Sequence, residues 1–161
     1  MQTSFNLFVK KISNPLRFGF FLASKLPAAF FVGLRLKHID AEKCIIGVRH
    51  SWFSKNPFKS MYFAAEAMAA EMSTGLLAFG YIYKQPKKVS MLVVKMEADY
   101  FKKGTGKIKF TCEDGKAIER AIQDTLKTGE AVTLKIKSIG ENEAGETIAS
   151  FQFTWSFKAK P

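Results

Sequence analysis

The sequence predicts an α+β fold in which an antiparallel sheet of about six strands curls around one long helix. Five segments alternate apolar and polar residues, which is the pattern of half-buried strands, and a sixth at residues 89–101 is predicted as a long strand. One segment, from about residue 58 to the high seventies, is rich in alanine and methionine and has the length of a helix. The strands come in pairs between helices, which favours an antiparallel sheet with the helices on one side. A chain of 161 residues indicates a single domain that spans residues 1–161.

The segment at residues 14–25 is predicted to form an amphipathic helix that packs on the domain. Arg17 and Lys25 interrupt its apolar run, and Pro27 follows. The uncharged stretch is shorter than the roughly 20 apolar residues that span a bilayer. No small-residue cleavage site follows it, so we expect a cytoplasmic protein. A helix that lies in a membrane surface is the alternative for this segment.

Two pairs of strands are predicted on either side of the long helix. RLKHID and KCIIGVRH, at residues 35–40 and 43–50, alternate around a short turn and predict a hairpin. After the loop KQPKK, a long strand at 89–101 is followed by the glycine turn KKGTGK and by KIKFTC at 107–112. These last two strands are predicted to form a second hairpin.

A short helix and a third pair of strands are predicted in the C-terminal part. Residues 114–129 follow the i, i+3, i+4 pattern, with Asp114 as a plausible N-cap and Gly129 at the C-terminal end. Residues 131–139 and 147–158 alternate and are joined by GENEAG. One face of the last strand should be formed by Ala149, Phe151, Phe153, Trp155 and Phe157.

Charge and composition narrow the classes of function. The formal net charge of +11 favours anionic partners such as a phosphate-bearing ligand or anionic lipid. The lysines form no dense run, so we expect no nucleic-acid partner. Cys44 and Cys112 each lie in an apolar strand and should be small core residues. There is no Cys/His cluster at zinc spacing, which argues against a metal site.

The long helix carries two carboxylates among its small residues. On a helical wheel Glu66 falls about 140° from the centre of the apolar face, so a solvated side chain is expected. Glu71 falls at the border of the apolar stripe, near Ala64 and Gly75. It is either a carboxylate at the helix edge that pairs with a lysine, or a general base whose pKa is raised by partial burial.

The start of this helix offers a second chemical element. Asn56, Pro57 and Phe58 lead into it, so its first backbone N–H groups could bind an oxyanion or a phosphate. Oxyanion donors and a carboxylate are two of the groups that acyl transfer needs. The alternative for Asn56 is that it only caps the helix.

The stretch NPFKSMYFAAEAMAAEMSTG resembles the hotdog-fold superfamily, and in particular its thioesterase-like branch DUF4442. Phenylacetyl-CoA-type hotdog thioesterases have an Asn before the helix, a His-Gly-Gly at its first turn and an acidic catalytic residue further along. Glu71 follows Asn56 by 15 residues, which is the spacing of that pattern. Tyr62, Phe63 and Ala64 stand where the pattern has His-Gly-Gly.

The resemblance implies a hotdog fold and an acyl thioester hydrolase acting on acyl-CoA or acyl carrier protein. Glu71 would be the base or nucleophile, and Asn56 would orient the water or the carbonyl. The N–H groups near Phe63 and Ala64 would hold the oxyanion, beside Tyr62. It also implies a homodimer or a dimer of dimers joined edge to edge, and such hydrolysis needs no metal or redox cofactor.

Two further functions stay open at this point. The first is a non-catalytic binder of acyl chains or lipids in the same fold, which the loss of His-Gly-Gly favours. The second is a dimeric module that docks on an anionic membrane surface through its basic residues and N-terminal helix.

Overall fold

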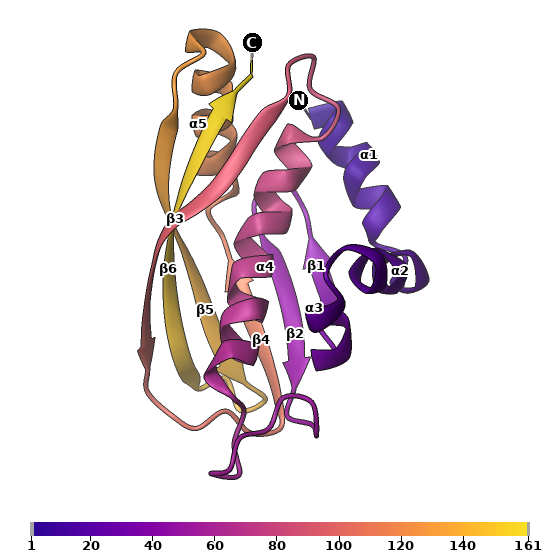
Figure 1. Cartoon of the computed structure of the whole chain (residues 1–161), viewed down its shortest axis with the longest axis vertical. Helices are drawn as coiled ribbons and strands as arrows, with labels where there is room; N and C mark the ends of the chain where they lie inside the picture. The colour runs from indigo at the N-terminus through magenta and orange to yellow at the C-terminus, as the bar shows by residue number, and fades with distance from the viewer. Residues whose placement is uncertain (1, 161) are drawn as a thin grey trace.

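The computed structural model describes residues 2–160 and shows a six-stranded, wholly antiparallel sheet that curls around one long helix (Figure 1). The strand order is β1-β2-β4-β5-β6-β3, which leaves β1 and β3 at the two edges. The strands are β1 (Arg35–Ile39), β2 (Cys44–Arg49), β3 (Val89–Tyr100), β4 (Lys107–Cys112), β5 (Val132–Asn142) and β6 (Thr147–Ala159). The helices are α1 (Gln2–Ile12), α2 (Pro15–Lys25), α3 (Pro27–Val32), α4 (Phe63–Ile82) and α5 (Gly115–Thr128).

The long helix α4 is the centre of the core. Its buried positions lie all round the helix rather than on one stripe, because the sheet covers one side and the N-terminal helices cover another. Alanine at 65, 69, 70 and 78 is at most 1% exposed, so the neighbouring elements approach the helix backbone closely. The predicted α+β architecture with a sheet wrapped around an alanine-rich helix is therefore confirmed.

The N-terminal helices form a layer on α4. Phe5 and Phe8 of α1 are buried against Gly80, where a Cβ atom would lie 2.6 Å from the Phe5 ring. Asn14 accepts hydrogen bonds from the first turn of α2, which starts one residue later. Leu16 and Phe20 of α2 remain exposed. Within residues 2–160, no helix is both long and apolar enough to cross a membrane.

The predicted second hairpin is wrong. β3 pairs along its whole length with β6, and β4 lies between β2 and β5. Residues 101–106 therefore cross from one edge of the sheet to its middle, instead of turning back on β3. The glycines in KKGTGK suggested a tight turn, but β3 has more apolar contact to gain from the long β6 than from six residues of β4.

The other two hairpins agree with the sequence pattern. β1 pairs with β2, and β5 pairs with β6. The predicted face of β6 is buried throughout, and Cys44 and Cys112 are buried free thiols. Gly129 ends α5 with φ +77°, as predicted, but the Asp114 side chain does not cap this helix. Its carboxylate accepts the backbone N–H of Lys137 instead.

Candidate active site

Asn56 orders the loop in front of α4. Its Oδ1 accepts the backbone N–H groups of Phe58 and Ser60, and its Nδ2 donates to Ser60 Oγ and to the carbonyl of Met61, both at 3.0 Å. The helix begins at Phe63, five residues later than predicted, because these bonds hold residues 56–61 in a separate turn. Asn56 therefore stabilises the loop before α4 and does not cap the helix itself.

The N-terminus of α4 lacks a side-chain cap. Tyr62 occupies the N-cap position with extended backbone angles and makes no side-chain hydrogen bond to the first turn. The backbone N–H of Ala65 donates to the Tyr62 carbonyl, which leaves the amides of Phe63 and Ala64 as the uncapped donors. The end of a helix dipole adds partial positive charge at the same place.

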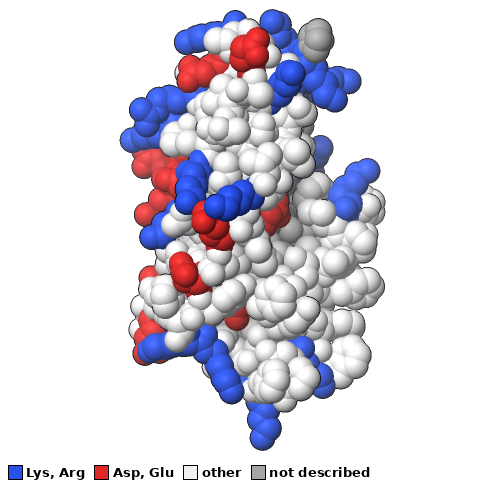
Figure 2. All heavy atoms as spheres, turned by 60° about the vertical axis from the view of Figure 1, so that its left-hand side comes forward, with Lys and Arg blue, Asp and Glu red and all other residues white. Residues whose placement is uncertain are grey.

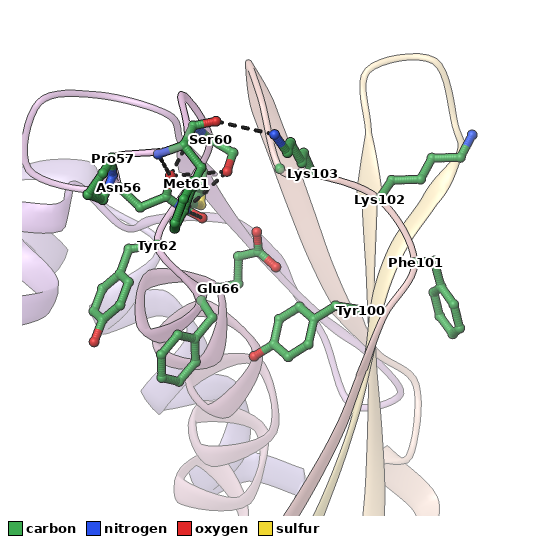
Figure 3. Close-up of a pocket in the computed structure, with 13 residues that line it drawn as sticks. Asn56, Pro57, Ser60, Met61, Tyr62, Glu66, Tyr100, Phe101, Lys102 and Lys103 are labelled. Atoms are coloured by element: carbon green, nitrogen blue, oxygen red, sulfur yellow. Dashed lines mark hydrogen bonds between the residues drawn. The ribbon is translucent and has the colours of Figure 1, made fainter.

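A cavity of about 470 Å³ opens beside this terminus (Figure 3). It lies between the loop before α4, the start of the helix and the segment that leaves β3. Its walls are formed by Asn56, Pro57, Phe58, Ser60, Met61, Tyr62, Phe63, Glu66, Tyr100, Phe101, Lys102, Lys103 and Gly104. In Figure 3 the side chains of Phe101 and Lys102 point away from Glu66, whereas Tyr100 lies beside it.

Glu66 is the buried acid of this cavity, and the expectation of a solvated side chain is wrong. The residue is only 2% exposed, and its Oε2 atom is enclosed without a hydrogen-bond partner. Burial raises the pKa of Glu66 to about 7. The helical-wheel prediction was wrong because it assumed that this side of α4 faces solvent. The loop at residues 101–106 covers that side instead.

Glu71 lies at the edge of the buried surface, as the helical wheel predicted. It is half-buried and lines a second, smaller cavity of about 250 Å³ between α4 and the α2–α3 connection. A Cβ atom on Gly75 would lie 3.0 Å from Glu71 Oε1, so the carboxylate passes over that glycine. Burial raises the pKa of Glu71. Among residues 2–160 no ion pair includes Glu71, although Lys25 lines the same cavity.

Within one chain the predicted site residues divide into two groups. Asn56, Tyr62 and Phe63 line the larger cavity together with Glu66, whereas Glu71 lines the smaller one. Ala64 is half-buried and lines neither of the two.

Sequence reasoning missed Glu66, Tyr100 and Gly104 as cavity residues. One signal could have found Glu66. The helix carries only two charged residues in 20, a composition that is typical of a helix buried on all sides rather than of an amphipathic helix. Tyr100 and Gly104 come from the crossing segment, which the predicted hairpin placed elsewhere.

The sequence model of one family, a domain of unknown function called DUF4442, matches residues 16–157. The chain belongs to the DUF4442 family. It shares the hotdog fold with solved structures to which it is only distantly related in sequence. No curated protein matches this DUF4442 chain at a significant level.

Solved structures similar to this DUF4442 protein include one thioesterase and another protein described as a probable thioesterase. A Pseudomonas aeruginosa protein of unknown function, described as a probable thioesterase, is 18% identical with a TM-score of 0.75, over 91% of this chain and 97% of that one. A Chlorobaculum tepidum protein of unknown function is 14% identical with a TM-score of 0.76, over the same shares of the two chains. A thioesterase from Staphylococcus aureus is 17% identical with a TM-score of 0.62, over 79% of this chain and 94% of that one.

Proposed function

We propose that the protein is an acyl thioester hydrolase that uses Glu71. The observation that carries this proposal is an unpaired, half-buried carboxylate on the same helix as an uncapped N-terminus, in a hotdog fold. The carboxylate can activate water as a general base, or attack the thioester carbonyl directly. The amides of Phe63 and Ala64 would bind the oxyanion that forms. Because Glu71 and Phe63 line different cavities of one chain, the proposal places Glu71 of one subunit beside the amides of the other subunit in a dimer. In this proposal Asn56 acts by fixing the loop beside those amides.

One solved neighbour supports the choice of Asn56 and Glu71 as a pair. The Staphylococcus aureus thioesterase has been solved with a glutamine at position 32 replaced by alanine, and also with a glutamate at position 47 replaced by alanine. Those positions are 15 residues apart, the same interval as from Asn56 to Glu71.

The proposal includes a homodimer formed through β3. This strand is 12 residues long, lies at a sheet edge and exposes Leu92, Val94 and Met96. A long apolar edge strand promotes aggregation when it is exposed in a monomer. Pairing with a second copy of the chain would cover it. Figure 2 shows a broad uncharged area on one side of the molecule, while acidic and basic side chains gather along the other side. The 470 Å³ cavity adjoins this edge, because Tyr100 lines the cavity and is the last residue of β3.

The ligand would be an acyl group on coenzyme A or on an acyl carrier protein. Lys102 and Lys103 at the cavity, and the net charge of +11, suit the phosphates of the former or the acidic surface of the latter. The aromatic side chains of Tyr62, Phe63 and Tyr100 suit an apolar acyl chain.

Hydrolysis of a panel of acyl-CoA and acyl carrier protein thioesters tests this function. We expect Glu71→Gln to lower kcat by about 10² to 10⁴, the range for loss of a general base. Glu130→Gln is the matched control, because Glu130 is exposed and lies next to β5, outside both cavities. Unchanged turnover in Glu71→Gln would remove this residue from the mechanism.

A non-catalytic acyl-chain or lipid binder is the second candidate. It is favoured by a third cavity of about 610 Å³ between α1, α2 and the end of α4, whose apolar walls include Phe8, Phe20, Phe21 and Phe79. Mass spectrometry of the purified protein would detect a retained fatty acid. A retained acid together with no hydrolysis of any thioester would favour this function over the first.

A further inference from the structure

We propose that the Glu66 carboxyl group donates a hydrogen bond to the acyl carbonyl of a thioester bound in the 470 Å³ cavity, a role that rests on the proposed hydrolase function. Glu66 would then be a catalytic residue that holds the developing oxyanion together with the amides, while Glu71 of the second subunit supplies the base or nucleophile. No bond to Glu66 forms or breaks in this step, and its proton stays on the carboxyl group.

The first support is the isolation of Glu66 from cations. Lys103 donates to the carbonyl of Phe58, and Lys102 pairs with Glu146. Neither lysine forms an ion pair with Glu66. An unpaired carboxylate is costly to bury, so burial shifts Glu66 towards the neutral acid, which predominates below about pH 7. Burial accordingly raises the pKa of Glu66 to about 7, and burial and Glu66 raise that of Tyr100 to about 12.

The second support is the close fit of the backbone around the carboxyl group. A Cβ atom on Gly104 would collide with Glu66 Oε1, so the crossing segment touches the acid at a residue without a side chain. The backbone carbonyl of Gly104 accepts the N–H of Met61 at 2.7 Å, which fixes this contact. Figure 3 shows the Glu66 side chain extending from α4 into the space below Lys103 and beside Tyr100.

The chemistry of the cavity selects a carbonyl as the partner of Glu66. A neutral carboxyl group has one O–H to donate, and Oε2 has no acceptor among residues 2–160. Because Oε2 is enclosed in the free chain, the carboxyl group would turn about its Cγ–Cδ bond to present the O–H to the cavity that Glu66 lines. A cationic ligand would meet two lysines in the cavity wall and would need the charged form of Glu66. An acyl carbonyl needs only a donor, and the aromatic walls can cover the chain attached to it. Neutral carboxylic acids do serve as oxyanion donors in enzymes.

The kinetic test compares Glu66→Gln, Glu66→Leu and the matched control Glu130→Gln. Leucine removes the donor, so kcat should fall about 100-fold with KM within about twofold, because the oxyanion exists only in the transition state. Glutamine keeps an N–H donor of similar shape, so its kcat should fall by less than about tenfold. A loss in Glu66→Gln as large as in Glu66→Leu would overturn the donor role in favour of a general base.

A second measurement does not depend on turnover. Infrared difference spectra would follow the C=O stretch of the protonated carboxyl as a ketone analogue of octanoyl-CoA, with CH₂ in place of the sulfur, is added. We expect a band that shifts to lower frequency with the analogue and is absent from Glu66→Gln. No band, or no shift at saturating analogue, would overturn the inference. If the wild type hydrolyses no thioester but this band shifts, the hydrolase function fails and the carbonyl contact stands.

Discussion

Glu66 combines two properties that rarely occur together in a stable core. It is 2% exposed, and no cation among residues 2–160 forms an ion pair with it. The facing Gly104 has no side chain, and a Cβ atom there would collide with Glu66 Oε1. A residue that served packing alone would be apolar here. The acid therefore carries a cost in stability at neutral pH that a functional role would explain.

This cost predicts how stability depends on pH. The pKa of Glu66 is about 7 in the folded protein against 4.5 for an unperturbed glutamate. The folded state thus holds the proton more tightly, so this group contributes stability below pH 4.5 that is lost as pH rises through 7. Glu66→Gln stays neutral throughout. Relative to this variant, the wild type should lose about 2 kcal/mol of unfolding free energy between pH 5 and pH 8.

Urea denaturation of both proteins at the two pH values measures this difference. Glu130→Gln serves as the control, because its side chain is exposed and its substitution should leave the pH dependence of the wild type unchanged. If the unfolding free energies of the wild type and Glu66→Gln changed equally between the two pH values, Glu66 would ionise in the folded protein as freely as in the unfolded chain.

The two glutamates of α4 show what a residue pattern can and cannot predict. Glu71 lies at the border of the buried surface near Gly75, as the helical wheel indicated. Glu66 was placed in solvent by the same wheel and is enclosed. The difference lies outside the helix, because a segment some 40 residues later in the chain folds over one glutamate and not over the other. No periodicity within α4 contains that information.

At the scale of elements, alternation predicted the strands well and their partners less well. The β6 face was predicted because Ala149 and four large aromatic residues recur at every second position, a signal that belongs to the strand itself. The pairing of β3 with β6 depends on two segments that are separated by β4, α5 and β5. The glycine turn after β3 favoured pairing with β4, but β3 pairs with the distant β6 instead.

The packing of α1 on α4 gives a second prediction. Gly80 is where α1 approaches α4, and a methyl group there would lie 2.6 and 2.8 Å from Phe5 ring atoms and 3.1 Å from Phe8. Alanine usually favours a helix over glycine by about 1 kcal/mol, but overpacking costs about 1–3 kcal/mol. We expect Gly80→Ala to be destabilising overall, with faster amide exchange in α1.

Hydrogen exchange by mass spectrometry over residues 2–12 measures the second effect. Gly19→Ala in α2 is the matched control, because a Cβ atom there meets nothing within 4 Å and should raise stability by about 0.5–1 kcal/mol. If Gly80→Ala stabilised the protein as Gly19→Ala should, α1 would not be held against the helix at this point.

At the scale of the whole molecule, the sheet has one edge that is short and one that is long and apolar. β1 has five residues, whereas β3 has 12 and is paired only with β6. The side chains of Leu92 and Met96 on β3 are 64% and 45% exposed. A second copy of the chain that pairs its own β3 here would extend the sheet and cover this surface.

We therefore expect sedimentation equilibrium to give about twice the chain mass of 18.1 kDa. The double variant Leu92→Lys with Met96→Lys should shift the protein towards the monomer, because four lysines would face one another across the two-fold axis. Leu7→Lys with Phe31→Lys is the matched control, since it adds the same charge at exposed apolar positions of α1 and α3. An unchanged dimer in the β3 variant would place the interface elsewhere. A monomeric wild type would contradict the proposed homodimer.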